Sequence, residues 1–248
     1  MSSSIPTTMC LEFAQGSMRI LIVAATATEI APVVTKLHGT GAGEGQTDSH
    51  PIGHYKYAGH DVDVLTTGVG MVATAAWCSR VLAASPYVFA LNLGVCGSFD
   101  PALPPGTVVQ IRSDRIAELG AEDGDRFLTA QQLKLVDDNE FPYLFGRLVN
   151  LTQPDIPALR QLPAVDAITV NTVHGNDRAI AAVRERFHPR VESMEGAAFM
   201  YACSIHPLRH AQVRAVSNLV ERRNRGAWKL AEAIDSLGQT AVSILDQL

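Results

Sequence analysis

The run Arg19-Ile-Leu-Ile-Val-Ala-Ala25 is apolar at every position after its first residue. A continuous apolar run, without alternation of polar residues, is typical of a strand buried on both faces of a parallel sheet. A helix is predicted directly after it at residues 29–37, with Thr28 as the candidate N-cap. This buried strand followed by a helix predicts an α/β fold.

The same alternation continues to the end of the chain. Further strands are predicted at residues 62–67, 87–93, 107–111, 167–170 and 211–217, and further helices at 70–84, 176–187, 194–205 and 226–248. Loops are predicted at 39–53 and 94–98, and the weakly patterned stretch 113–161 is expected to form loops that cover the functional site. Strands that alternate with helices imply right-handed crossovers and a sheet covered on both faces. We therefore expect one α/β domain over residues 18–248.

The N-terminal residues 1–17 contain no Lys or Arg and no apolar core of the kind that a secretory signal requires. We expect them to be either a disordered leader or an artefact of the assigned start site, with Met18 opening the fold. No stretch approaches the roughly 18 to 20 apolar residues needed to span a bilayer. The expectation is a protein without a membrane segment.

Composition excludes several classes of function. The chain has 248 residues, 47% of them hydrophobic, and a formal net charge of −5, so no basic excess favours nucleic-acid binding. The cysteines lack the CxxC spacing of zinc sites and disulfide frameworks, which predicts reduced thiols in a cytoplasmic protein. They are Cys10, Cys78, Cys96 and Cys203. No metal is expected.

Gly68-Val-Gly70 lies between a predicted strand and a predicted helix, where backbone amides can hold an anion. A dinucleotide fingerprint would need a third glycine where the sequence has Ala73. A tight turn before the helix is therefore the preferred interpretation, and no organic cofactor is expected.

Three polar residues are candidates for chemistry, and each also has a purely structural interpretation. Glu195, next to Met194, precedes a predicted helix, where a carboxylate gains about 0.3–1 kcal/mol from the helix dipole. It could instead accept hydrogen bonds from the two hydroxyls of a ribose. Asn218 ends a strand, where Asn commonly begins a turn, and Glu29 could be an ordinary surface residue. No one of these segments decides the function alone.

Taken together and in order, the segments resemble the methylthioadenosine/adenosylhomocysteine nucleosidases and the wider purine nucleoside phosphorylase superfamily. The matching pieces are residues 19–25 with Glu29, Thr67-Gly-Val-Gly-Met71, Asn92-Leu-Gly-Val-Cys-Gly97, Glu192-Ser-Met-Glu-Gly-Ala-Ala198 and Arg214-Ala-Val-Ser-Asn218. The resemblance implies a three-layer αβα fold with a central mixed sheet.

The resemblance also implies roles for individual residues. Glu195 and Met194 would bind ribose, the loop that carries Val95 and Gly97 would line the base and ribose site, and Glu29 would activate the attacking water. A homo-oligomer is expected by analogy.

Charge favours water over phosphate as the nucleophile. A phosphorylase must hold a phosphate dianion with Arg and hydroxyl donors. In the hexameric phosphorylases the corresponding loop resembles Arg-x-Gly-Ser-Cys-Gly, whereas this chain has Asn92 and Val95 at the Arg and Ser positions. An anionic Glu29 would repel phosphate further.

The base is predicted from Asn218, because adenine-specific nucleosidases have Asp at this position. A neutral amide suits N7 and the oxygen of a 6-oxopurine, so we expect a hypoxanthine-like base.

The segment Val220-Glu-Arg-Arg-Asn-Arg225, followed by Trp228, resembles that of the futalosine hydrolases, a branch that serves menaquinone biosynthesis. Their substrate resembles inosine and carries a carboxyphenyl ketone on its 5′ side. Arg223, Arg225 and Trp228 would either contact this group or lock the loop through Glu221. The alternatives are a methylthioadenosine-type or broad purine nucleosidase, and a non-catalytic nucleoside-binding protein.

Overall fold

The computed structural model describes residues 17–39 and 51–248. Nearly all of the predicted leader and most of the predicted loop at 39–53 lie outside these residues. The strands are β1 (Arg19–Ala24), β2 (Ile52–Tyr57), β3 (His60–Thr66), β4 (Phe89–Ser98), β5 (Val108–Ile116), β6 (Gly120–Asp123), β7 (Arg126–Thr129), β8 (Tyr143–Leu144), β9 (Arg147–Val149), β10 (Ala164–Thr169), β11 (Val191–Ser193) and β12 (His210–Leu219). The helices are α1 (Ala27–His38), α2 (Met71–Ala84), α3 (Pro157–Arg160), α4 (Asp177–Phe187), α5 (Gly196–Ile205) and α6 (Leu230–Leu245), with a 3-10 turn η1 (Arg225–Ala227).

Within the described residues, ten strands form one mixed sheet in which β1 is central and buried on both faces, as its apolar run predicts. β1 pairs in parallel with β3 on one side and with β4 on the other. β4 also pairs in parallel with β12 and, through its last residues, antiparallel with β11. Because β12 pairs with β5, and β5 and β11 both pair with β10, these strands form a closed circuit.

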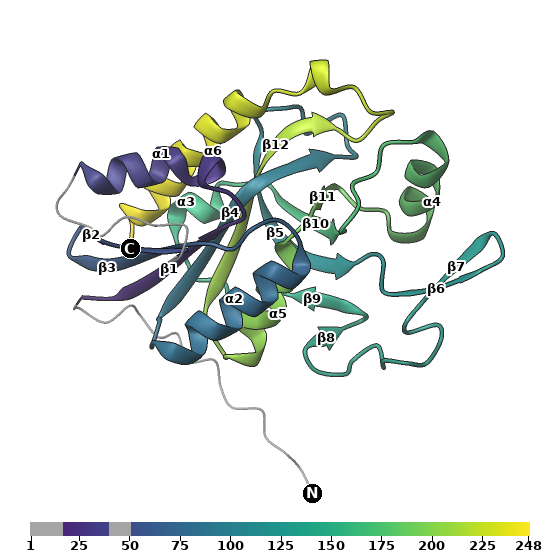
Figure 1. Cartoon of the computed structure of the whole chain (residues 1–248), viewed down its shortest axis with the longest axis horizontal. Coiled ribbons are helices and arrows are strands. Elements are labelled where there is room, and N and C mark those ends of the chain that lie inside the picture. Colours follow the sequence, from purple (N-terminus) through teal and green to yellow (C-terminus); the bar gives the residue numbers. More distant parts are fainter. Residues whose placement is uncertain (1–16, 40–50) are drawn as a thin grey trace, which may run out of the picture.

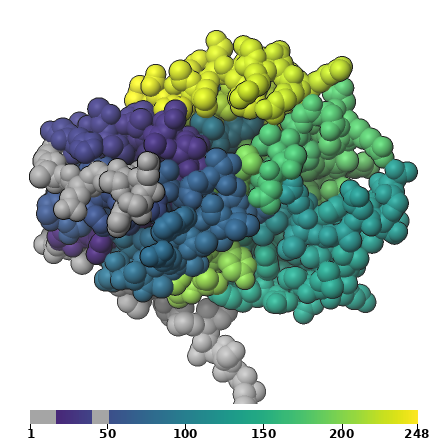
Figure 2. Space-filling model, viewed as in Figure 1, coloured from purple at the N-terminus to yellow at the C-terminus, as the bar shows by residue number. Residues whose placement is uncertain are grey.

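Helices cover both faces of this sheet (Figure 1). α1, α3 and α6 pack together on one side, and α2 packs against α5 on the other. Each side has its own buried apolar cluster, one around Ile22 and Leu237 and one around Leu21 and Phe199. In the space-filling view the yellow C-terminal segment lies along one edge of the molecule, next to the purple α1 (Figure 2). The predicted three-layer αβα fold with a mixed sheet is confirmed.

The first helix begins earlier than predicted. Its N-cap is Thr26 and not Thr28, because Thr26 and Glu29 form a reciprocal capping box. Thr26 Oγ1 accepts from the backbone N–H of Glu29, and the Glu29 carboxylate accepts from the backbone N–H of Thr26.

The predicted loop at 94–98 is wrong, since β4 continues through it. Its backbone pairs with β12 over residues 94–98 and with β11 at Gly97 and Ser98. These partners are distant in sequence, and local glycines therefore gave a misleading loop signal.

Residues 113–161 are also more ordered than predicted. β5 extends to Ile116, β9 and β8 continue the sheet, and β6 and β7 form a hairpin that projects from the body of the molecule (Figure 1). These strands span four residues or fewer apart from β5, which is too short for a visible periodicity.

The last helix starts at Leu230, so the prediction that it begins at residue 226 is wrong. The preceding segment contains η1 and is tied back to β12, because the backbone N–H of Lys229 donates to the carbonyl of Ser217 at 2.8 Å. This attachment holds η1 and the residues that follow it beside the end of β12, ahead of α6.

Candidate active site

Glu29 is held rigidly where α1 leaves β1. Its Oε2 accepts from the backbone N–H of Thr26 at 3.0 Å and from the Thr26 hydroxyl at 2.8 Å. Its Oε1 accepts from the backbone N–H of Val95 at 3.1 Å. The residue is 8% exposed. Glu29 is therefore buried and fixed against β4, which argues against an ordinary surface role.

Gly94 is the point at which Glu29 and Arg214 meet. A Cβ at this position would overlap Nη1 of Arg214 and would lie 3.1 Å from Oε1 of Glu29. The absence of a side chain thus lets a guanidinium and a carboxylate approach the same strand.

Glu195 is the N-cap residue of α5, yet its side chain makes no capping hydrogen bond. One carboxylate oxygen instead accepts from the backbone N–H of Gly70 at 3.0 Å, and the other lies 3.8 Å from Nη1 of Arg214. Burial raises the pKa of Glu195, and the Arg214 charge and the Gly70 amide oppose this increase. The negative charge of Glu29 contributes to the raised pKa of Glu195.

Arg214 is a fully buried cation with several polar partners. Its Nε donates to Oε1 of Gln212 at 3.1 Å, and its Nη2 donates to the side-chain oxygen of Asn92. Asn92 in turn donates to the carbonyl of Val23 at 3.0 Å. The residue at the phosphorylase Arg position therefore serves here to hold Arg214 in place.

Behind Gln212 lies a buried carboxylate, Asp114, which accepts from Nε2 of Gln212 at 3.1 Å and from the hydroxyl of Thr169 at 2.9 Å. Burial raises the pKa of Asp114 to about 6, although these two hydrogen bonds oppose the shift. The polar network thus runs from Glu29 and Arg214 into the centre of the sheet.

Asn218 lies near the end of β12, directly opposite Gly97 of β4, after an irregularity in the pairing at Ser217. Its Nδ2 donates to the carbonyl of Leu219 at 2.9 Å, and its Oδ1 accepts from the hydroxyl of Ser217 at 2.8 Å. The side chain is only partly buried, so its amide is accessible from the cavity described next.

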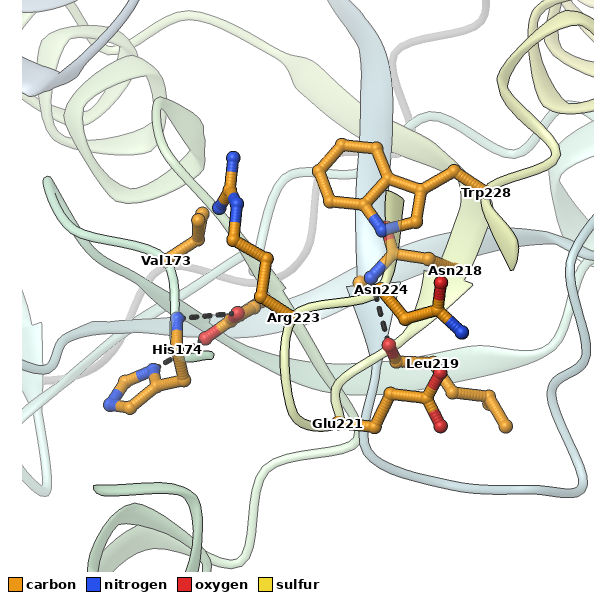
Figure 3. Close-up of a pocket in the computed structure, with 10 residues that line it drawn as sticks. Val173, His174, Asn218, Leu219, Glu221, Arg223, Asn224 and Trp228 are labelled. Carbon is orange, nitrogen blue, oxygen red and sulfur yellow. Dashed lines mark hydrogen bonds and ion pairs between the residues drawn. The ribbon is translucent and has the colours of Figure 1, made fainter. Parts of the chain in front are cut away.

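A cavity of about 50 Å³ opens beside Asn218 (Figure 3). Its wall includes Gly97, His174, Glu192, Asn218, Arg223 and Trp228. None of its lining residues belongs to 113–161, so the prediction that this stretch covers the site is not met at this cavity.

Glu192 and His174 were not among the site residues predicted from the sequence. The backbone N–H of His174 donates to Oε1 of Glu192 at 3.1 Å, and His174 Nδ1 lies 2.6 Å from Oε2 (Figure 3). Glu192 was visible in the sequence as the second acid beside Glu195, but Glu192 lies within the strand β11 whereas Glu195 is the N-cap residue of α5. No local pattern pointed to His174.

The predicted residues form two adjoining groups. Glu29 and Glu195 lie beside Arg214, Val95 donates its backbone N–H to Glu29, and Met194 directly precedes Glu195 in the chain. Gly97, Asn218 and Trp228 line the cavity. β4 connects the groups, because Val95 binds Glu29 and Gly97 faces Asn218 two residues later.

The loop after β12 rests on the loop before α4, through a backbone hydrogen bond of 3.1 Å from Arg223 to Gly175. The guanidinium carbons of Arg223 and Arg225 lie 5.7 Å and 5.9 Å from the ring centre of Trp228. Arg225 itself does not line the cavity. Throughout the described part of the chain, Glu221 forms no ion pair with either arginine, and the proposed lock through Glu221 is absent.

Residues 17–39 and 51–248 contain no cluster of three or more His, Cys, Asp or Glu side chains that could hold a metal ion. In that same part, no helix is long and apolar enough to cross a membrane.

A mixed sheet between two helical layers, with acids and an amide gathered at the end of β4, defines the class of this protein. The phosphorylase superfamily model matches residues 19–247, and the chain belongs to that superfamily.

Within it, the chain is similar to the futalosine hydrolase of Streptomyces coelicolor, with 33% identity over 188 residues that cover 71% of this chain and 74% of the relative. Two Helicobacter pylori structures share its fold. A futalosine hydrolase has a TM-score of 0.78 at 16% identity, with 93% and 98% of the two chains covered. A methylthioadenosine/adenosylhomocysteine nucleosidase has a TM-score of 0.79 at 16% identity, with 94% and 100% covered.

Proposed function

We propose that this chain is a futalosine nucleosidase, which hydrolyses the bond between hypoxanthine and ribose in a step of menaquinone biosynthesis. The observation that carries the proposal is the arrangement along β4, where Glu29 binds the backbone at Val95 and Asn218 faces Gly97. Relatives named futalosine hydrolase support the choice of substrate. The reaction as proposed needs only water and no cofactor.

Glu29 is the proposed general base. Its three hydrogen bonds, from Thr26 and Val95, fix the carboxylate and leave about one further acceptor site, on Oε1. A water bound there can be oriented and deprotonated as it attacks C1′ of an oxocarbenium-like ribosyl group.

Glu195 is the proposed partner of the 2′ and 3′ hydroxyls. Gly70 and Arg214 orient its carboxylate from two sides, and a carboxylate can accept from both hydroxyls of a diol. Met194 and Val95 would contact the sugar beside it. Positioning of this kind lowers the barrier without taking part in bond breaking.

Asn218 and Gly97 are proposed to bind the base. The amide of Asn218, now bonded to the carbonyl of Leu219, would turn to N7 and O6 of the departing hypoxanthine. Both of these purine atoms are acceptors, so the Nδ2 group is the part of the side chain that stabilises the leaving base.

The charge around Glu29 supports hydrolysis over phosphorolysis. The one guanidinium described at Gly94 is that of Arg214, which already binds Gln212 and Asn92 and lies beside Glu195. Two carboxylates next to one committed cation disfavour a phosphate dianion.

Trp228 and Arg225 are proposed to contact the 5′ substituent of the substrate, together with Arg223. The guanidiniums of Arg223 and Arg225 lie near the Trp228 indole. Both residues are exposed, and neither has an acidic partner in the described residues. An aromatic wall with free cations suits a carboxyphenyl group.

We also propose that the protein is a cytoplasmic homo-oligomer. Val69 and Val72 are 57% and 82% exposed and flank Gly70, the residue that binds Glu195. A second copy of the chain would cover this apolar edge. Light scattering on the purified protein tests this, and a monomer at micromolar concentration would contradict it.

The decisive experiment incubates the purified protein with futalosine and identifies the released base. We expect hypoxanthine in phosphate-free buffer, at a rate that added phosphate leaves unchanged. Methylthioadenosine and inosine serve as competing substrates, and faster release of adenine from methylthioadenosine would favour that alternative. Binding of nucleosides without release of any base would leave a non-catalytic binding protein.

A further inference from the structure

Glu192 occupies the other side of the same base cavity from Asn218. Gly97 of β4 pairs with Asn218 of β12 in the parallel register and with Glu192 of β11 in the antiparallel register. A Cβ at Gly97 would lie 3.4 Å from Nδ2 of Asn218 and 3.6 Å from Cγ of Glu192. The amide and the acid therefore flank one glycine and line one cavity.

The carboxylate of Glu192 is oriented by a single residue. His174 provides its backbone N–H to one oxygen at 3.1 Å and its Nδ1 to the other at 2.6 Å. The Glu192 side chain is 3% exposed, and each oxygen keeps acceptor capacity beyond its bond to His174. Unused acceptor sites on a buried carboxylate are energetically costly, and a donor group of a ligand in the cavity would satisfy them.

A purine places N1 and N7 on opposite sides of the substituent at C6. In a 6-oxopurine N1 carries a hydrogen and donates, whereas in a 6-aminopurine N1 is an acceptor. If Asn218 binds the N7 and O6 edge, a carboxylate across Gly97 would face N1. It would accept a hydrogen bond from N1–H of the oxo form and would repel the N1 lone pair of the amino form.

We propose that Glu192 is the specificity-determining acceptor for N1–H of a 6-oxopurine, and that His174 is its positioning residue. The inference rests on the proposed function, because it uses the same base site, and it assigns the choice between oxo and amino bases to a second residue besides Asn218. It involves no covalent step.

The first experiment measures kcat/KM for futalosine and for its 6-amino analogue with the wild-type protein and Glu192→Gln. Loss of a hydrogen bond to a charged acceptor predicts that the oxo-over-amino preference falls about tenfold or more. Glu185→Gln is the control, since Glu185 is exposed on α4 and does not line the cavity. Its preference should equal that of the wild type. An unchanged preference in a folded Glu192→Gln protein would overturn the proposal.

A second experiment separates the role of His174 from general damage. His174→Ala should lower the same preference severalfold, and in the Glu192→Gln background it should have no further effect on it, since His174 acts through Glu192. An equal additional loss in that background would remove His174 from this role.

A binding measurement on the wild-type protein distinguishes failure of the inference from failure of the proposed function. By calorimetry, hypoxanthine should bind about tenfold or more tightly than adenine and than 1-methylhypoxanthine, which lacks N1–H. Equal affinities would overturn the role of Glu192 even if futalosine is hydrolysed. Tight hypoxanthine binding without futalosine hydrolysis would refute the proposed substrate and leave the base site intact.

Discussion

Nη1 of Arg214 lies 3.8 Å from Oε2 of Glu195, and both side chains are buried. Removing one partner of a buried pair leaves an uncompensated charge, which is strongly destabilising. The site therefore depends on this pair, because Arg214 holds the Glu195 carboxylate, which is proposed to bind ribose, next to β4 and Glu29.

Gly94→Ala tests the close approach of Arg214 to β4. The added Cβ would overlap the guanidinium, which Asn92 and Gln212 hold from the other side. We expect the free energy of unfolding to fall by about 1–3 kcal/mol, measured by chemical denaturation. Gly39→Ala is the control, because its φ of −66° suits alanine and its Cβ would meet only ordinary contacts. Equal stability of the two variants would contradict the packing described here.

Glu29→Gln should lower kcat for futalosine by about 100- to 10,000-fold, because an amide cannot take the proton of the attacking water. KM should change little. Thr26→Ala removes the N-cap but keeps the carboxylate, and should cost about 1 kcal/mol of stability with a much smaller effect on kcat. Near-wild-type turnover by Glu29→Gln would remove Glu29 from the role of base.

Asn218→Asp should shift the preference toward 6-aminopurine nucleosides by about tenfold or more, since a protonated carboxyl can donate to N7 while its ionised form repels O6. The ratio of kcat/KM for inosine to that for adenosine measures the shift. An unchanged ratio would show that Asn218 does not select the base.

The buried Asp114 predicts how stability depends on pH. Burial raises its pKa from 3.8 to about 6, so between these values the folded protein binds a proton more tightly than the unfolded chain. The stabilisation of the folded protein by protonated Asp114 is fully present below about pH 4 and is lost as the pH rises through about 6. The free energy of unfolding should therefore fall by roughly 1 to 3 kcal/mol over this range.

Denaturation of Asp114→Asn over the same pH range checks this, because an amide does not titrate. Its slope between pH 4 and 6 should be flatter than that of the wild type. The exposed Asp125, paired with Arg178 at the surface, provides the control Asp125→Asn. Identical slopes for Asp114→Asn and the wild type would rule out Asp114 as the titrating group.

Much of this protein was predictable from local sequence. The apolar run at residues 19–25 is the buried strand β1, because burial on both faces leaves no place for polar side chains. Asn176 caps α4 at the predicted boundary, and the motifs around Glu195 and Asn218 indicated the superfamily to which the chain belongs. These features depend on neighbours within a few residues.

Tertiary structure alone decided the rest, because the contacts join segments far apart in the chain. Residues 94–98 are a strand only because β12 and β11 supply hydrogen-bond partners. The pairing of His174 with Glu192, and the meeting of Arg214 with Glu29 at Gly94, depend on how the sheet closes. The sequence contains the acids and amides of the site. Only the packed sheet determines which of them lie close enough to interact electrostatically, to form a hydrogen bond or to line the same cavity.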